Sequence, residues 1–268
     1  MKRGVCVAGA TGWTGRAVAE AVLRADDLVL RSAVSRSAAG QDLGRAWGTE
    51  PNGVPVFERV SEALDEVQVL VDYTSDQAVR GATLAAIERG VSVVIGTSGL
   101  GAEDFAEIDA AARDAGVGVV AAGNFSITAA MAQAAALLAA RFLPNREIID
   151  YASAGKHDAP SGTAREIAER LAAVNPTEVQ VPLDQVRGQV DARGATVADT
   201  QVHSVRLPSF VVSTEVVFAL PDERLSIRHD AGSTPTPYVA GTLLAIRAVA
   251  GRTGLVRGLD TLLLGTGA

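Results

Sequence analysis

The chain has 268 residues, of which 48% are hydrophobic and 21% are charged. This composition excludes a disordered, collagen-like or coiled-coil protein, because it supplies enough apolar surface to bury a core. The net charge of -7 argues against nucleic acid as a partner, and the single cysteine excludes an internal disulfide framework or a cysteine-rich metal site.

The first residues give no sign of a targeting or membrane segment. Met1-Lys2-Arg3 leads into Val5–Ala8, which is too short for a signal-peptide core or a membrane span. The longest apolar run, Ile127–Ala140, is interrupted by Thr128 and Gln133 and has the length of a buried helix. We therefore expect a cytoplasmic protein with no membrane partner.

The first half alternates between β-branched runs and Ala-, Glu- and Arg-rich stretches with helical spacing. Strands are predicted at Val5–Ala8, Leu28–Val34, Val67–Asp72, Val91–Ile95 and Val117–Ala121. Helices are predicted at Ala17–Arg24, Gln77–Arg89 and Ala102–Ala115. Strands without in/out alternation, separated by helices, indicate a parallel sheet covered on both faces. The fold class is therefore α/β, with an N-terminal doubly wound, Rossmann-type domain.

The pattern changes after Asn124. Helices are predicted at Ile127–Ala140, Gly162–Ala173 and Thr236–Val249, and strands at Glu147–Ser153, Gln201–Leu207, Val211–Phe218 and Arg224–His229. Residues 175–200 are polar and irregular. Consecutive strands favour an antiparallel or mixed sheet in a second, α+β domain. We place the domains at 1–125, completed by 236–268, and at 126–235.

A glycine-rich loop, Gly9-Ala10-Thr11-Gly12-Trp13-Thr14-Gly15, follows the first strand and is followed by Arg16. Glycines allow a tight turn, close approach of the backbone to a pyrophosphate, and packing of helix on strand. A helix N-terminus then offers N–H groups to phosphate. The motif predicts a dinucleotide site, although a tight turn without a ligand is the alternative.

The end of the second strand discriminates between the two nicotinamide cofactors. An acidic residue there would bind the ribose 2′-OH, whereas an arginine accommodates a 2′-phosphate. The segment Ala33-Val34-Ser35-Arg36-Ser37 has no carboxylate, which favours NADPH, with NADH possible. Arg16 could add a second positive group or lie solvated on the surface.

Three further loops should lie at carboxyl ends of strands, where ligands bind in open α/β sheets. Their candidate cofactor contacts are Thr74, Gly96, Thr97, Ser98, Asn124 and Phe125. Each loop alone is equally typical of ordinary turn chemistry.

These loops and the segment Lys156-His157-Asp158-Ala159-Pro160-Ser161-Gly162-Thr163-Ala164 together resemble the 4-hydroxy-tetrahydrodipicolinate reductase (dihydrodipicolinate reductase) family. Segments 202–207 and 225–230 extend the resemblance over nearly the whole chain. Enzymes of this family serve lysine and diaminopimelate synthesis. The resemblance implies a nucleotide domain completed by the C-terminal helix, and a second domain whose open mixed sheet holds the substrate site and builds a homotetramer.

The resemblance also assigns residues. Hydride passes from the nicotinamide to the ring of a cyclic dicarboxylate, and Lys156 matches the proton-donating lysine. Gly162 and Thr163 match the pair that binds a substrate carboxylate. Ser161, in the same motif, and Ser153, at a substrate-binding position of the family, complete the candidate substrate contacts.

Two departures from the family concern the same site. The family has a His-His pair upstream of the lysine, the first for proton transfer and the second for substrate binding. Here these positions are Ala152 and Ser153. A basic residue usually follows the Arg-His-Asp strand, but residues 231–235 read Ala-Gly-Ser-Thr-Pro. We therefore expect an altered substrate site.

The proton donor has several candidates. Lys156 and Lys2 are the only lysines of the sequence, and we expect a functional Lys156 rather than a surface lysine in a turn. His157 could replace the lost acid, although its place after Lys156 also allows the ring to point away. Tyr151 is a further candidate, with strand packing as the alternative. His203 and His229 are interpreted as structural, and no histidine has metal-ligand spacing.

The start of the helix at Gly162 has two interpretations that are compatible. Its amides could bind a carboxylate, and Thr163-Ala164-Arg165-Glu166 reads as a capping box in which the Thr163 hydroxyl serves its own helix. Cys6 is expected in the core and Trp13 near the cofactor.

The sequence thus predicts an NADPH-dependent reductase of a small molecule, a cyclic or conjugated imine-type carboxylate. The nearest alternative is the genuine 4-hydroxy-tetrahydrodipicolinate reductase. Two others are an amine dehydrogenase acting on a diamino acid and a non-catalytic NADP-binding protein.

Overall fold

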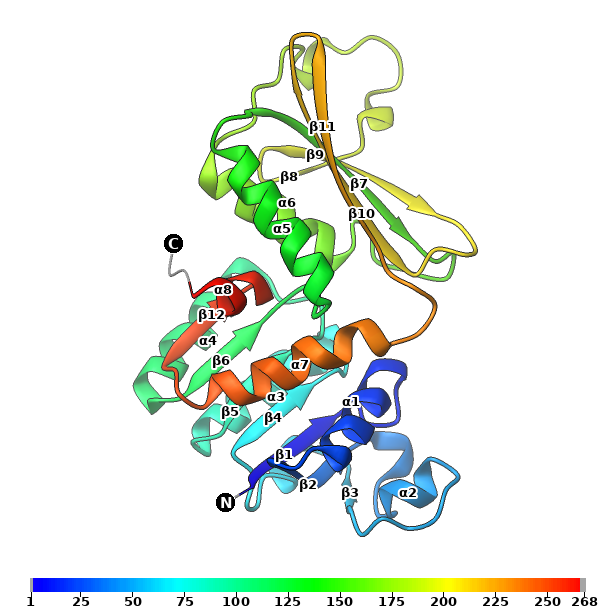
Figure 1. Cartoon of the computed structure of the whole chain (residues 1–268), viewed down its shortest axis with the longest axis vertical. Helices are drawn as coiled ribbons and strands as arrows, with labels where there is room; N and C mark the ends of the chain where they lie inside the picture. The colour runs from blue at the N-terminus through cyan, green and yellow to red at the C-terminus, as the bar shows by residue number, and fades with distance from the viewer. Residues whose placement is uncertain (1, 266–268) are drawn as a thin grey trace. The chain divides into compact units, whose positions relative to one another are not determined.

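Seven parallel strands form the sheet of the first structural unit, in the order β12-β6-β5-β4-β1-β2-β3 (Figure 1). The computed structural model describes residues 2–265. The strands are β1 (Arg3–Ala8), β2 (Leu28–Val34), β3 (Val56–Phe57), β4 (Val69–Asp72), β5 (Ser92–Ile95), β6 (Gly118–Ala121) and β12 (Gly254–Arg257). This confirms the Rossmann-type class, with β3 and β12 as strands that the sequence did not predict.

Helices cover both faces of this sheet. They are α1 (Trp13–Arg24), α2 (Leu43–Ala46), α3 (Asp76–Glu88), α4 (Ala102–Ala115), α7 (Thr236–Val249) and α8 (Leu259–Leu264). α1 packs beside α7 on one face, and α3 beside α4 on the other. α4 illustrates how the sequence sets helix ends: Asp104 accepts from the Gly101 N–H at 2.8 Å, and Gly116 ends the helix at φ 69°.

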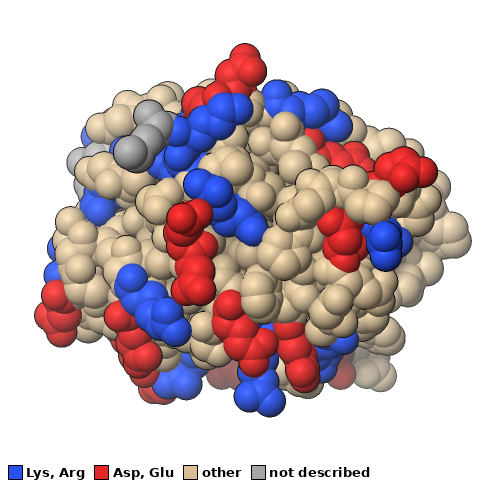
Figure 2. All heavy atoms as spheres, turned by 90° about the horizontal axis from the view of Figure 1, so that it is seen from below, with Lys and Arg blue, Asp and Glu red and all other residues tan. Residues whose placement is uncertain are grey.

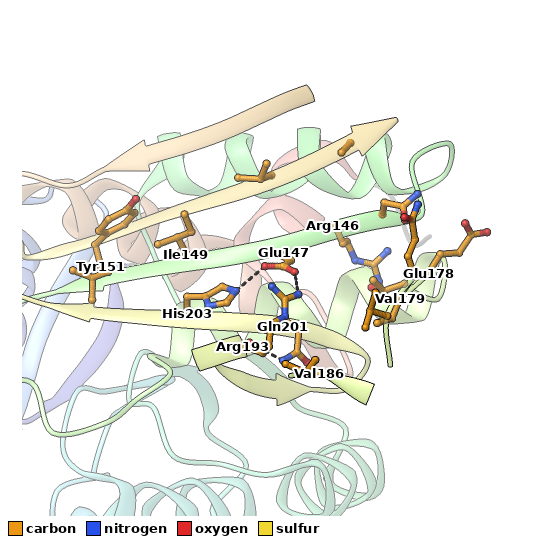
Figure 3. A pocket seen from close by; sticks show the side chains of 17 residues that line it. Arg146, Glu147, Ile149, Tyr151, Glu178, Val179, Val186, Arg193, Gln201 and His203 are labelled. Atoms are coloured by element: carbon orange, nitrogen blue, oxygen red, sulfur yellow. Dashed lines mark hydrogen bonds and ion pairs between the residues drawn. The ribbon is translucent and has the colours of Figure 1, made fainter. Parts of the chain in front are cut away.

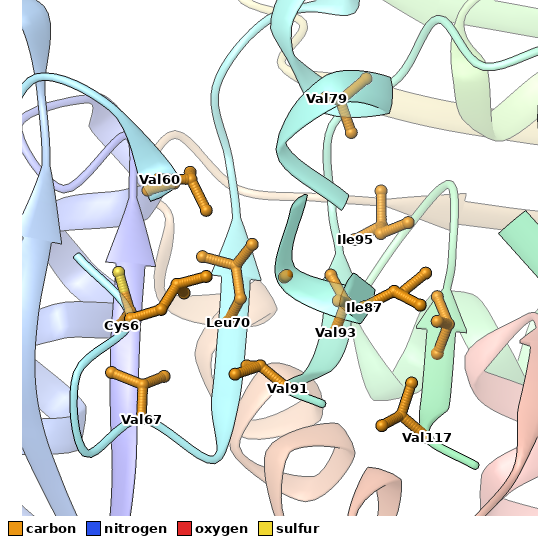
Figure 4. Packing of buried hydrophobic residues seen from close by; sticks show 14 of the residues in the cluster. Cys6, Val60, Val67, Leu70, Val79, Ile87, Val91, Val93, Ile95 and Val117 are labelled. Atoms are coloured by element: carbon orange, nitrogen blue, oxygen red, sulfur yellow. The ribbon is translucent and has the colours of Figure 1, made fainter. Parts of the chain in front are cut away.

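The core beneath α3 and α4 consists of side chains from strands and helices that are far apart in the sequence (Figure 4). Leu70, Val93 and Val119 come from three neighbouring strands, and Ile87 and Ile108 come from the two helices. Cys6 lies among them fully buried. Continuous β-branched strands are expected in a sheet that is covered on both faces.

The second unit spans Ile127–Thr234, whereas the first combines the chain up to Ser126 with the chain from Pro235 on. Its mixed sheet has the order β11-β10-β7-β9-β8. The strands are β7 (Asn145–Ala152), β8 (Ala195–Val197), β9 (Thr200–Arg206), β10 (Val212–Leu220) and β11 (Glu223–Asp230), and the helices are α5 (Ile127–Ala140) and α6 (Gly162–Val174). Both helices pack on one face of this sheet, around Ile148, Leu171 and Phe218.

Several sequence expectations need correction at the level of local structure. α1 begins at Trp13, because the glycine loop passes directly into the helix. The stretch 175–200 contains two short 3-10 helices, Leu183–Gln185 and Val190–Arg193, besides β8. The helix cap predicted at Thr163 is wrong: Ser161 is the N-cap of α6, and its hydroxyl accepts from the Ala164 N–H at 3.3 Å.

Among the described residues, no helix is both long and apolar enough to cross a membrane. On the face shown in Figure 2, basic and acidic side chains are interspersed, and neither sign forms a broad continuous patch. This face therefore lacks the basic surface that follows a nucleic-acid backbone.

Candidate active site

The glycine loop between β1 and α1 is so closely packed at Gly9 and Gly15 that neither position has room for a side chain. Gly9 has φ +80°, and a Cβ there would lie 2.2 Å from the Tyr73 carbonyl oxygen. A Cβ on Gly15 would lie 2.1 Å from the Gly9 carbonyl oxygen. Gly12, the N-cap of α1, has no side chain to cap the helix amides. The loop thus brings backbone close to backbone and presents a helix N-terminus to an anion.

A groove of about 1010 Å³ in the first unit adjoins this loop. Six predicted cofactor contacts line it, namely Gly9, Thr11, Gly12, Ser35, Arg36 and Thr74. The Thr11 and Ser35 hydroxyls are hydrogen-bonded at 2.8 Å, which joins the glycine loop to the end of β2. Arg59 also lines the groove, beside Glu58. Arg59 was not predicted as a cofactor contact, because no strand or motif in the sequence marks its position.

Asp72, the last residue of β4, organises two of the predicted loops. Its Oδ1 accepts from the Thr74 N–H at 3.0 Å, from the Thr74 hydroxyl at 2.7 Å and from the Thr97 hydroxyl at 2.6 Å. Burial raises the pKa of Asp72, although these hydrogen bonds oppose the shift. The geometry of both loops therefore depends on one buried carboxylate.

Tyr73 shapes the loop that follows β5. Its ring fills the space where a Cβ on Gly96 would lie, 2.2 Å from Tyr73 Cε1. The Tyr73 hydroxyl is hydrogen-bonded to Thr242 of α7 at 2.7 Å, and burial raises its pKa. Phe125 is buried with its ring 6.3 Å from that of Tyr73. α7 thus helps to build this part of the first unit.

The other predicted cofactor residues lie outside the lining of the groove. Arg16 donates to Glu20 at 2.9 Å and stacks over Trp47 at 5.4 Å, so its charge already has partners. Trp13 is 52% exposed and contacts Tyr238 edge to face. Asn124 Oδ1 accepts from the Ser126 N–H, Thr14 is half-buried and Ser98 is exposed.

In the second unit, the segment between β7 and α6 holds the predicted catalytic lysine. The Lys156 N–H donates to the Ser153 carbonyl at 3.0 Å, and its Nζ lies 2.8 Å from Asp158 Oδ1. Burial opposes ionisation of Asp158, but the hydrogen bond and charge of Lys156 outweigh it and lower the pKa of Asp158. His157 is exposed. The segment therefore places one ammonium group and one carboxylate in direct contact.

The start of α6 adjoins the same segment. Ser161 is buried, its N–H and hydroxyl donating to Asp150 at 2.8 and 2.6 Å. Gly162 and Thr163 are the first residues of the helix, which is the position where backbone amides bind carboxylates. Asp150 was not predicted as a site residue, because nothing in the sequence marks it as the partner of Ser161.

The positions of the family's histidine pair differ from each other in exposure. Ala152 is fully buried, whereas Ser153 is exposed. Neither side chain is a proton donor in the physiological range. Tyr151 donates to Glu215 at 3.3 Å and its ring lies against Phe210 and Arg228, as expected for strand packing.

The two remaining histidines have polar partners. His203 Nε2 lies 2.7 Å from Glu147 Oε2, and His229 Nε2 lies 3.0 Å from the Thr128 hydroxyl. Burial lowers the pKa of His229. Within residues 2–265, no group of acidic, histidine and cysteine side chains could hold a metal ion.

A second pocket, of about 990 Å³, lies over the other face of the mixed sheet (Figure 3). Glu147, Arg193 and His203 point toward one another there, and Glu147 forms an ion pair with Arg193 and a hydrogen bond with His203. Ile149 and Val205 supply apolar lining. Of the candidate proton donors, Tyr151 lines this pocket, whereas Lys156, His157 and the predicted substrate contacts do not.

Family comparisons cover nearly the whole chain. The model described as "Dihydrodipicolinate reductase, N-terminus" matches residues 3–125, and the model described as "Dihydrodipicolinate reductase, C-terminus" matches residues 123–263. The 4-hydroxy-tetrahydrodipicolinate reductase of Thermosynechococcus vestitus is 40% identical over 270 residues, covering 97% of this chain and 96% of the relative. That of Moorella thermoacetica is 40% identical over 263 residues, covering 97% of each.

A solved structure supports the same assignment. The dipicolinate-bound dihydrodipicolinate reductase of Paenisporosarcina sp. TG-14 superposes with a TM-score of 0.76 at 29% identity, covering 97% of this chain and 99% of that one. The chain therefore belongs to the dihydrodipicolinate reductase family and is an NAD(P)H-dependent oxidoreductase.

Proposed function

We propose that the chain reduces a cyclic or conjugated imine-type substrate that has one carboxylate, with NADPH as the preferred reductant. The observation that supports this most directly is the pair of residues before Lys156. Ala152 and Ser153 replace two imidazoles that would recognise a dicarboxylate and handle its proton. Because Lys156 and the start of α6 match the family, we expect the chain to keep the reduction step. Because the two imidazoles are absent, we expect it to recognise a different substrate.

The groove beside the glycine loop fits a dinucleotide. A Cβ on Gly9 or Gly15 would collide with backbone, so the chain keeps an open approach that a pyrophosphate needs. Its volume of about 1010 Å³ is that of a large ligand pocket. Arg36 and Arg59 line it, and β2 ends without an acidic residue, which supports a 2′-phosphate and hence NADPH.

The residues of the second unit provide the proton and one anchor. When bound, the cofactor supplies a hydride, which adds to the carbon of the C=N or C=C bond. Lys156 gives its proton to the atom at the other end of that bond, so that the bond becomes single and the lysine becomes neutral. Asp158, 2.8 Å away, holds the ammonium in place before the transfer. The amides of Gly162 and Thr163 bind the carboxylate.

A second candidate is 4-hydroxy-tetrahydrodipicolinate itself. Relatives with this activity in their names are 40% identical over nearly the whole chain. In this alternative, Lys156 donates the proton without help from a histidine, and the first amides of α6 bind one of the two carboxylates of the substrate.

The deciding experiment measures NADPH oxidation with freshly generated 4-hydroxy-tetrahydrodipicolinate and, in parallel, with a panel of cyclic imines that have one carboxylate. We expect turnover on the panel and little on the dicarboxylate. Efficient turnover on the dicarboxylate alone would establish the second candidate. Lys156→Ala is the control, and its turnover should fall at least about 100-fold if Lys156 is the proton donor.

We also infer a homo-oligomer, as the family resemblance implies. The face of the mixed sheet opposite α5 and α6 carries the apolar side chains Ile149, Val205 and Val217. Light scattering coupled to size-exclusion chromatography tests this: a monomeric mass at micromolar concentration would contradict it.

A further inference from the structure

Asp150 and Arg206 form a buried ion pair at the ends of two parallel strands. Asp150 is fully buried in β7, and Arg206 is the last residue of β9, with its side chain 17% exposed. Arg206 Nη2 donates to Asp150 Oδ2 at 2.8 Å, and the Ser204 hydroxyl donates to the same oxygen at 3.2 Å. A buried carboxylate is stable only when its oxygens have such partners.

Both members of this pair also bind the segment that follows β7. Asp150 accepts from the N–H and hydroxyl of Ser161, the residue that caps α6. Arg206 Nη2 donates to the Asp158 carbonyl at 2.7 Å. Asp158 in turn holds Lys156 through its side chain. The ion pair therefore binds the backbone at both ends of the segment 158–161, at the Asp158 carbonyl and at the Ser161 N–H.

We propose that Asp150 and Arg206 are positioning residues that fix Lys156 and the first amides of α6 relative to each other. This proposal rests on the proposed function for the role of Lys156. In this role neither residue needs to touch the reacting atoms. Their effect is geometric, because the planar guanidinium bonds a carboxylate and a carbonyl at once and so sets the distance between strand and segment.

The expected consequence is a loss of turnover rather than of cofactor binding. A misplacement of about 1 Å in a catalytic group costs on the order of 100-fold in rate. We therefore expect Arg206→Gln and Asp150→Asn to lower kcat by about 10- to 100-fold. The KM for NADPH should stay unchanged, since the groove lies in the first unit. Asp150→Glu, which keeps the carboxylate, should recover part of the lost turnover.

Arg146→Gln provides a matched control. Arg146 is a buried arginine near the other end of β7, and it pairs with Asp199 at 3.2 Å. Its loss should lower the melting temperature as Arg206→Gln does, but it should leave kcat within about threefold of wild type, because no group of the Lys156 segment is involved. Equal losses of kcat in both variants would reduce the role of Arg206 to stability.

A second readout needs no substrate. Lys156 and Lys2 are the only lysines, so the rate of acetylation of each can be followed by peptide mass spectrometry in full-length protein. We expect acetylation of Lys156 to be about two- to fivefold faster in Arg206→Gln and Asp150→Asn, as its ion pair with Asp158 loosens. Lys2 serves as the internal reference, and Arg146→Gln should change neither rate.

The two readouts separate this proposal from the proposed function. If the wild type reduces none of the tested imines, the proposed function fails while the acetylation result still tests the positioning. If the wild type is active and both variants keep wild-type kcat and acetylation rates, the positioning role is overturned.

Discussion

The Thr97 hydroxyl donates a 2.6 Å hydrogen bond to Asp72 Oδ1, although Asp72 ends β4 and Thr97 lies in the loop after β5. The same oxygen accepts hydrogen bonds from both the N–H and the hydroxyl of Thr74. One carboxylate oxygen thus links the ends of β4 and β5, at the edge of the parallel sheet where ligands bind. The geometry of the proposed cofactor loops depends on this link.

Thr97→Val tests the link directly. Losing a hydrogen bond to a charged acceptor should lower the free energy of unfolding by about 1.5–3 kcal/mol, and NADPH affinity should fall because the loop after β5 is no longer held. Urea unfolding and fluorescence titration with NADPH measure the two effects. Thr83→Val is the control: this hydroxyl is buried in α3 and has no hydrogen-bond partner, so its removal should cost nothing. Equal effects of the two substitutions would contradict the prediction.

Asp72 should also make the free energy of unfolding depend on pH. Burial raises its pKa in the folded protein, whereas the unfolded carboxyl titrates near about 3.9. Its favourable contribution is therefore fully present below about pH 3.9 and is lost as the pH rises through the folded pKa. The stability of wild type relative to Asp72→Asn should fall as the pH is raised over this window, measured by urea unfolding at a series of pH values.

Asp199 provides a contrast of opposite sign. Burial opposes its ionisation, but hydrogen bonds from the Thr177 N–H and the Thr200 hydroxyl, with the charge of Arg146, lower its pKa. Its contribution is present above about pH 3.9 and is lost as the pH falls through the folded pKa. The stability of wild type relative to Asp199→Asn should therefore rise with pH. Parallel trends for the two variants would contradict one of the two assignments: a shared fall with pH contradicts that of Asp199, and a shared rise contradicts that of Asp72.

Local patterns predicted the elements that are long and regular. The expected bounds of α4 and α5 agree with the structure, because α4 has helical spacing over fourteen residues and α5 is an Ala-rich run of the same length. β3 and β8, with two and three residues, are too short for any periodicity to appear. The cap of α6 was predicted at the wrong hydroxyl, since Thr163 and Ser161 both stand near the helix start and only the backbone path decides between them.

Long-range polar partners could not be predicted from the sequence. The bond between Asp150 and Arg206 joins residues that are 56 positions apart, and it depends on the register in which Ala152 of β7 pairs with Arg206 of β9. The motif around Lys156 indicated which residues matter, but not what holds them. Arg59 was missed for a similar reason, because only the folded groove places it with Arg36.

Comparing Gly9→Ala with Gly40→Ala should distinguish the cost of a steric clash from the cost of left-handed backbone strain. Gly9 and Gly40 both have φ +80°, but a Cβ at Gly9 would lie 2.2 Å from a carbonyl oxygen, whereas a Cβ at Gly40 meets nothing within 4 Å. Gly40→Ala should thus cost only the left-handed strain, about 1–2 kcal/mol. Gly9→Ala should cost more and abolish NADPH binding. If the two variants unfold at the same urea concentration and both bind NADPH, the loop tolerates the side chain.

Arg59 is expected to contribute to cofactor choice. It lines the same groove as Arg36, and a charge-assisted contact with a 2′-phosphate is worth about 1.5–3 kcal/mol. Arg59→Gln should therefore raise the KM for NADPH by about tenfold or more and leave the KM for NADH unchanged. Arg45→Gln, at an exposed arginine outside the groove, should change neither value. An equal rise for NADPH and NADH would show that Arg59 does not contact the phosphate.

Restoring an imidazole before Lys156 tests whether the missing pair determines the substrate. Ser153 is exposed whereas Ala152 is fully buried, so Ser153→His adds a ring without disturbing the core. If the absent imidazole limits recognition, Ser153→His should raise kcat/KM for 4-hydroxy-tetrahydrodipicolinate by about tenfold, the value of one charge-assisted hydrogen bond, with little gain on imines with one carboxylate. Ala154→His places the same ring at the next exposed position and should have no such effect. A Ser153→His protein that is no better than wild type on the dicarboxylate, with its melting temperature intact, would mean that other residues set the substrate.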